Sequence, residues 1–168
     1  MRIASVLLLL LLSGCGYHTP GASETWVGGE ARTLYVQLFD NQTIEPYLEN
    51  YITDALVAEL AVSRLFELTE NPGKADVRLV GNVKDFIETA ISYGQSDQIT
   101  EYSATMAIAV RLLDKNSSDI LWQKNLTRSE DYLATINKNL QLEGQRLAAV
   151  RVSQRLAEDI YASMLNSF

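Results

Sequence analysis

Few residues in this sequence could do chemistry, and they are badly placed for it. The 168 residues include one histidine, His18, and one cysteine, Cys15, both near the start of the chain. A disulfide requires a second cysteine, a structural zinc site requires about four Cys or His ligands, and a nucleophilic Ser–His or Cys–His pair would have to use His18. We therefore expect no catalytic residue, no metal site and no cofactor, and the hypothesis of a hydrolase fails.

Carboxylates are plentiful, but their patterns do not form a convincing site. Glu130 and Asp131 are adjacent, so in a strand their side chains point to opposite faces and cannot act on one substrate. Asp40, Asn41 and Thr43 could ligate a cation, although a turn before a helix explains the same three residues more simply. We therefore look for function in the surfaces that the helices and strands of the chain expose to a binding partner.

The start of the sequence has the pattern of an export signal. Arg2 precedes an apolar run that ends with Leu7 to Leu12, and this run is too short to cross a bilayer, which takes about 20 residues. The next residues complete Leu12-Ser13-Gly14-Cys15, which is similar to the lipobox of bacterial lipoproteins. We expect residues 1–14 to be a lipoprotein signal peptide and Cys15 to be acylated. The alternative is an ordinary secretory signal with a chance cysteine.

Residues 15–31 are expected to comprise the acylated cysteine and a short tether. Each buried methylene contributes about 0.8 kcal/mol, so two or three acyl chains hold a protein on a membrane that it does not span. Gly16 follows the cysteine, and by analogy with lipoproteins this favours the periplasmic side of the outer membrane. The tether reaches at most about 55 Å, so the domain must work close to its membrane. Tyr17 and Trp26 either anchor the tether at the interface or dock it on the domain.

Hydrophobic periodicity predicts a single domain over residues 32–168. Alternation predicts strands over 33–39, 75–93, 99–113 and 120–126, and three-to-four spacing predicts a helix from about 48 to 63 and another of about 25 residues at the end of the chain. We expect Pro46 at the first position of the first helix. Asn137 or Asn139 is expected to cap the second helix.

The turns between these segments set the predicted topology. The residues Gly94-Gln95-Ser96-Asp97 separate two long strands, which should therefore form a long hairpin. The residues Asp40-Asn41-Gln42 are also typical of a turn. The element order is βαβββα. This order predicts an α/β two-layer sandwich, with a four-stranded, mainly antiparallel or mixed sheet and two helices on one of its faces.

Charge is distributed unevenly along the chain. The net charge is −7; residues 16–136 hold 9 Lys and Arg against 18 Asp and Glu, whereas residues 137–168 hold 4 against 3. Binding through phosphates needs a surplus of cations, so we expect no nucleic acid partner. We expect an anionic ligand to be contacted around Lys138. The alternative is that Lys138 is a solvated lysine in a loop and binds no ligand. The charged side chains of the last helix, Arg146, Arg151, Arg155, Glu158 and Asp159, are expected to form a solvated face.

Several segments in chain order resemble the LptE family of lipopolysaccharide-assembly lipoproteins. These are Leu12-Ser13-Gly14-Cys15-Gly16-Tyr17-His18, Val36-Gln37-Leu38-Phe39-Asp40-Asn41-Gln42-Thr43 with Glu45-Pro46 and Leu48-Glu49, Glu101-Tyr102, Leu121-Trp122 and Ala157-Glu158-Asp159-Ile160. The resemblance runs from Cys15 to the end of the chain. It implies a non-enzymatic partner of the LptD-like outer-membrane β-barrel that inserts lipopolysaccharide into the outer leaflet.

Members of this family plug that barrel, aid its assembly and bind lipopolysaccharide through basic residues near the hairpin and the last helix. Lys138 fits the second location. The tip from Gly94 through Gln95 and Ser96 to Asp97 has no Lys or Arg, so here we expect contact with the barrel instead. The alternative function is a lipoprotein that activates a peptidoglycan synthase or forms part of a secretion channel. A synthase activator needs a long spacer, which the short tether does not supply.

Overall fold

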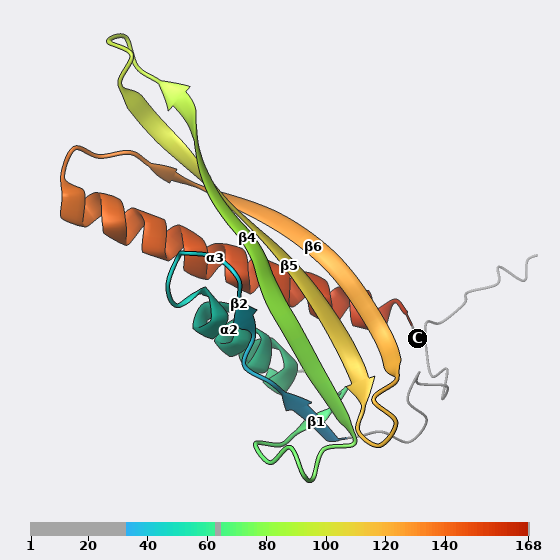
Figure 1. Cartoon of the computed structure of the whole chain (residues 1–168). Coiled ribbons are helices and arrows are strands. Elements are labelled where there is room, and N and C mark those ends of the chain that lie inside the picture. The colour runs from blue at the N-terminus through green and yellow to red at the C-terminus, as the bar shows by residue number, and fades with distance from the viewer. Residues whose placement is uncertain (1–32, 63–64, 168) are drawn as a thin grey trace, which may run out of the picture.

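The computed structural model describes residues 33–62 and 65–167. The signal peptide, the acylation of Cys15 and the tether lie outside the described residues and stay predictions. The elements are β1 (Thr33–Val36), β2 (Asp40–Asn41), α2 (Leu48–Val62), β3 (Glu67–Leu68), β4 (Val77–Tyr93), β5 (Ile99–Asp114), β6 (Ile120–Leu133) and α3 (Lys138–Leu165). Figure 1 shows long, twisted strands with both helices packed beside them.

The sheet is mixed, as predicted, but it has six strands instead of four. Its order is β3-β1-β4-β5-β6, and β2 pairs with β4 beside β1. The pairs made by β1, β2 and β3 are parallel, whereas β4, β5 and β6 are antiparallel. Asp40 and Asn41 were predicted as a turn and instead pair with Asn82 and Val83. A two-residue strand is too short to show alternation, so only its long-range pairing reveals it.

Both helices lie on one face of the sheet, which confirms the predicted layers. Alternate residues of β5 from Met106 to Leu112 are buried in one core with Leu56 of α2 and Leu156 of α3. The opposite face, which includes Thr127 and Ser129, is open to solvent. The predicted strand over 120–126 in fact continues to Leu133.

The helix boundaries follow from capping and backbone geometry. Asn137 caps α3, because its side-chain oxygen accepts hydrogen bonds from the backbone N–H of Asn139 at 3.0 Å and Leu140 at 3.3 Å. The first helix begins at Leu48 and not at Pro46. Tyr47 lies between them in a left-handed conformation, with φ of 69°, and this conformation cannot continue into a right-handed helix.

The loop that joins β1 to α2 is held by its own polar side chains. The Asn41 side-chain oxygen accepts hydrogen bonds from the backbone N–H and the hydroxyl of Thr43 at 3.0 and 2.8 Å. The Asn41 amide donates to the Glu45 carbonyl at 2.7 Å and to the Glu49 carboxylate at 2.8 Å. The Asp-Asn-x-Thr motif therefore builds the entry to α2, as expected, although its first two residues pair with β4 and do not form a turn.

Candidate functional site

The tip of the β4–β5 hairpin is the part of the domain that extends furthest from the helices (Figure 1). The Gly94 N–H donates to the Gln98 carbonyl at 2.8 Å, and the Asp97 N–H donates to the Gly94 carbonyl at 3.2 Å. Asp97 takes a left-handed φ of 54°, which Asp tolerates in tight turns. The predicted residues Gly94 to Asp97 thus form one ordered turn.

Large apolar side chains are exposed at this same end of the molecule. They come from four elements and the loop before α3: Ile87, Ile91, Tyr93, Ile99, Leu133, Ile136, Leu140 and Leu142. Leu133 is 77% exposed and Ile136 is fully exposed. We call these side chains and the tip the hairpin-end surface. Exposed apolar side chains in such number at one end of a protein are typical of a binding surface.

A groove of about 470 Å³ lies within the hairpin-end surface. It is lined by Gln98, Ile99, Thr100, Tyr102, Ala134, Thr135, Ile136 and Gln141. Gln141 holds the wall in place, since its side-chain oxygen accepts a hydrogen bond from the Thr135 N–H at 2.9 Å. Lys138, the first residue of α3, is exposed two residues after the groove residue Ile136. The structure therefore brings the start of α3, where Lys138 lies, and the tip to the same end of the domain (Figure 1).

A small second core supports the hairpin-end surface from below. Tyr132 is buried there with Ala104 and Ala148, and its ring stacks on Tyr102 with centroids 5.6 Å apart. The Tyr132 hydroxyl donates a hydrogen bond to the Glu88 carboxylate. Burial and then this hydrogen bond raise the pKa of the Tyr132 phenol well above its usual range. The hairpin-end surface therefore lies on a layer of buried, packed side chains.

Hydrophobic periodicity does not indicate this second core, although one residue signals it. Gly144 lies inside α3, where glycine is unfavourable. A Cβ at Gly144 would lie 3.1 Å from Cδ2 of Tyr132. The glycine lets the Tyr132 ring lie close against the helix.

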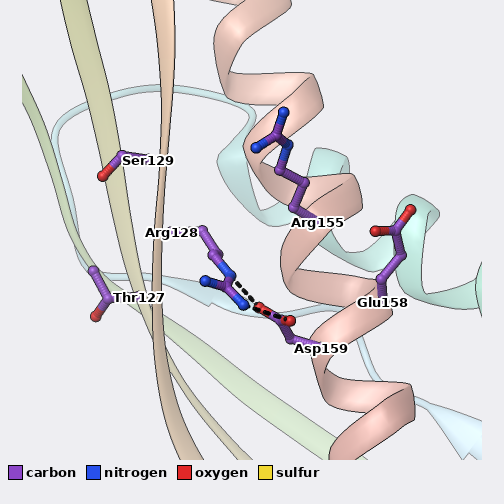
Figure 2. Close-up of a pocket in the computed structure, with 6 residues that line it drawn as sticks. All are labelled: Thr127, Arg128, Ser129, Arg155, Glu158 and Asp159. Carbon is purple, nitrogen blue, oxygen red and sulfur yellow. Dashed lines mark hydrogen bonds and ion pairs between the residues drawn. The ribbon is translucent and has the colours of Figure 1, made fainter.

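A second groove, which is polar, runs between β6 and α3 (Figure 2). Its first part has a volume of about 510 Å³ and is lined by Thr127, Arg128, Ser129, Arg155, Glu158 and Asp159. A second part of about 530 Å³ continues along β6 past Lys124 towards the end of α3. We call both parts together the β6–α3 groove.

Ion pairs join the two sides of this groove. Arg128 forms a two-pronged pair with Asp159, and Glu130 pairs with Arg151 at 2.9 Å and Arg155 at 3.0 Å. The Arg128 hydrogen bonds hold the pKa of the Asp159 carboxyl below its usual range. Arg151 and Arg155 were expected on a solvated face; they remain partly exposed but also bind the strand.

The described residues offer no arrangement suited to metal binding. In the ranges 33–62 and 65–167, no three His, Cys, Asp or Glu side chains gather as metal ligands. Glu130 and Asp131 lie in β6, where Asp131 accepts a hydrogen bond from Ser103 at 2.5 Å, while Glu130 faces α3. Within the same ranges, no helix is long and apolar enough to cross a membrane.

Comparison with known proteins identifies the family. The model of the LptE family, described as lipopolysaccharide-assembly, matches residues 31–164. The chain belongs to the LptE family. This family is one of non-enzymatic lipoproteins. No curated protein sequence gives a significant match to the chain.

Three solved structures share the fold of this LptE-family protein at low sequence identity. A putative lipoprotein from Caulobacter crescentus has 14% identity and a TM-score of 0.56, over 76% of this chain and 88% of that one. The hypothetical protein CT253 from Chlamydia trachomatis has 12% identity and a TM-score of 0.56, over 80% and 96%. Rare lipoprotein B from Shewanella oneidensis has 11% identity and a TM-score of 0.54, over 81% and 96%. These likenesses show the fold alone.

Proposed function

We propose that this LptE-family protein is an outer-membrane lipoprotein, anchored through Cys15 on the periplasmic side, that plugs an LptD-like β-barrel translocon and helps to assemble it. The barrel inserts lipopolysaccharide into the outer leaflet. The family match over residues 31–164 carries the proposal. The protein supplies contact surfaces to the complex and no catalytic group.

The hairpin-end surface is the part that we assign to the barrel lumen. When a partner covers its apolar side chains, the complex is stabilised by roughly 25 cal/mol per Å² of apolar area removed from water. The tip carries Asp97 and no cation among Gly94 to Asp97. Contact with barrel residues therefore suits the tip better than contact with the phosphates of lipopolysaccharide.

Lipopolysaccharide binding at this surface is assigned to Lys138. Residues 16–136 are strongly acidic, so phosphates would be repelled from most of the domain unless divalent cations bridge them. Lys138→Glu should therefore weaken lipopolysaccharide binding and leave barrel association intact. Lys115→Glu, in the turn at the opposite end of the sheet, is the matched control.

Site-specific crosslinking in the outer membrane tests the proposed function. A photocrosslinker at Ser96, in the tip, should capture residues of the barrel lumen, whereas one at Asn116, in the β5–β6 turn, should not. Barrel and lipoprotein should purify in about equal amounts, and depletion of the lipoprotein should leave the barrel misassembled. Capture of a cell-wall synthase from Ser96, with lipopolysaccharide export unchanged on depletion, would instead support the alternative function.

A further inference from the structure

The outer edge of β6 is open and unusually regular. Strand β6 comes last in the sheet order and pairs with β5 in one register from Trp122 to Leu133. Other edges of the described sheet are interrupted or short: β3 has two residues, and β4 has register shifts at Val83/Asp85 and Ala90/Ser92 once β2 has ended. Bulges and short strands protect an edge from pairing with another chain. Strand β6 has neither kind of protection along this stretch.

The hydrogen-bond pattern shows which backbone groups of β6 face outward. The Ala134 N–H donates to the Thr100 carbonyl at 3.0 Å, and the same register pairs Tyr132 with Tyr102 and Arg128 with Met106. In an antiparallel ladder only alternate residues bond to the neighbouring strand. Even-numbered residues of β6 therefore bond to β5. The odd-numbered residues direct their N–H and C=O groups to the open side: Gln123, Asn125, Thr127, Ser129 and Asp131.

The side chains of these odd-numbered residues leave the edge accessible. They are short or uncharged except for Asp131, and none is a proline or a lysine, the residues that most often block an edge. The β6–α3 groove runs beside the same edge (Figure 2). A strand added to β6 would therefore have one row of its side chains facing α3 across this groove.

Charge in the groove favours one kind of occupant. Residues 120–167 carry six Lys and Arg against five Asp and Glu, whereas the described residues from 33 to 119 carry five against fourteen. Lys124, Arg128 and Arg155 line the groove beside Glu158 and Asp159. Arg128 is paired with Asp159 and Arg155 with Glu130, so among the described residues Lys124 is the groove cation that forms no ion pair. A second copy paired through its own β6 would bring the Lys124 side chains of the two copies to one shared edge, which is unfavourable. A segment that carries carboxylates on its groove-facing side would be attracted instead.

We propose that the open edge of β6 is a docking site to which an extended, carboxylate-bearing segment of the β-barrel partner adds as a further strand. This inference rests on the proposed function, because it names a contact within the same complex. Main-chain hydrogen bonds to the odd-numbered residues supply affinity, and Lys124 selects the acidic segment.

Crosslinking from neighbouring strands distinguishes the edge from the open sheet face. Thr127 and Ala107 are cross-strand partners, and both side chains lie on the open face. A photocrosslinker at Thr127 should capture the barrel, and one at Ala107 should capture it at least fivefold less. Equal capture from both positions, capture of a second copy from Thr127, or no capture from Thr127 in an intact complex would overturn the docking site.

Backbone and charge variants test the same site by affinity. Thr127→Pro removes an outward N–H that β5 does not use, so it should weaken barrel binding by about three- to tenfold, the effect of one hydrogen bond. Thr127→Ala keeps that N–H and should bind normally. Lys124→Glu should weaken binding more than Lys84→Glu, which makes the same charge change on β4.

The outcomes separate this inference from the proposed function. Thermal unfolding of each purified variant shows whether it folds, and the crosslinks from Thr127 and Ala107 remain decisive if Thr127→Pro does not. If the barrel co-purifies but the edge variants bind as the unchanged protein does, the docking site is wrong and the proposed function stands. If no barrel co-purifies with the unchanged protein, both are wrong.

Discussion

At the residue scale, the packing of Phe39 on Gly81 joins the loop after β1 to the sheet. Phe39 is 2% exposed, and its backbone N–H donates to the Thr53 hydroxyl at 3.1 Å. A Cβ at Gly81 would lie 2.1 Å from Cε1 of the buried ring, so Gly81→Ala must displace that ring. We expect a loss of about 1–3 kcal/mol in the free energy of unfolding, measured by urea denaturation. Gly94→Ala, where the nearest atom is 3.4 Å away, should change it by less than about 0.5 kcal/mol.

The ion pair between Arg128 and Asp159 predicts a pH dependence of stability. Its hydrogen bonds lower the pKa of Asp159 in the folded protein, so the folded state binds fewer protons than the unfolded state. The stabilisation is present above the unfolded pKa, about 4, and is lost as pH falls through the lowered folded pKa. Asp159→Asn should therefore reduce the melting temperature at pH 7, and the difference should disappear in strong acid. Glu158→Gln, one residue earlier in α3, should show a smaller difference at pH 7; an equal one would mean that the pair is not responsible.

At the element scale, the two helices share one core, and single truncations can measure this. Leu56 of α2 and Leu156 of α3 are both fully buried in the same cluster. Leu56→Ala and Leu156→Ala should each lower the free energy of unfolding by about 2–5 kcal/mol. Val62→Ala, at an 81% exposed position at the end of α2, should cost under about 0.5 kcal/mol. Losses below about 1 kcal/mol at both leucines would contradict the packing.

At the scale of the whole molecule, the first described residue, Thr33, and the hairpin-end surface lie at opposite ends of the domain. The described chain begins at Thr33 beside the β5–β6 end of the sheet, and β5 alone has 16 residues, about 53 Å at 3.3 Å each. The tether can extend at most about 55 Å. We therefore expect residues 15–31, if fully extended, to span about the length of β5, which would allow the hairpin-end surface to lie near the membrane.

The predicted anchor is tested at Cys15. Cys15→Ser should leave an unprocessed precursor without a lipid label, because the thiol that accepts the diacylglycerol is missing. Metabolic labelling with palmitate, followed by separation of precursor and mature protein, measures both effects. Normal processing of this variant, with the mature domain still in the outer membrane, would refute the lipoprotein prediction. The unchanged protein is the positive control.

Local periodicity alone predicted the long elements and much of the core. The alternation in β4 and β5, the turn between them, the stripe that contains Leu156 and the Asn137 cap depend on neighbours a few residues apart, so the sequence displays them directly. The scarcity of His and Cys likewise excluded several kinds of catalytic and metal site without any structure. These features are local in the chain, and local patterns can be read from it.

Only the tertiary structure decided the pairings between distant segments. Strand β2 exists because Asp40 meets Asn82, 42 residues later, and β6 extends to Leu133 because Arg128 and Glu130 find partners on α3. From the sequence alone, charged residues on the side of a strand that faces the helices indicate that the strand has ended. The support under the hairpin-end surface, Tyr132 on Glu88, likewise joins residues 44 apart in the sequence. Such contacts form only when the whole chain folds, since no local spacing encodes which distant charges will meet.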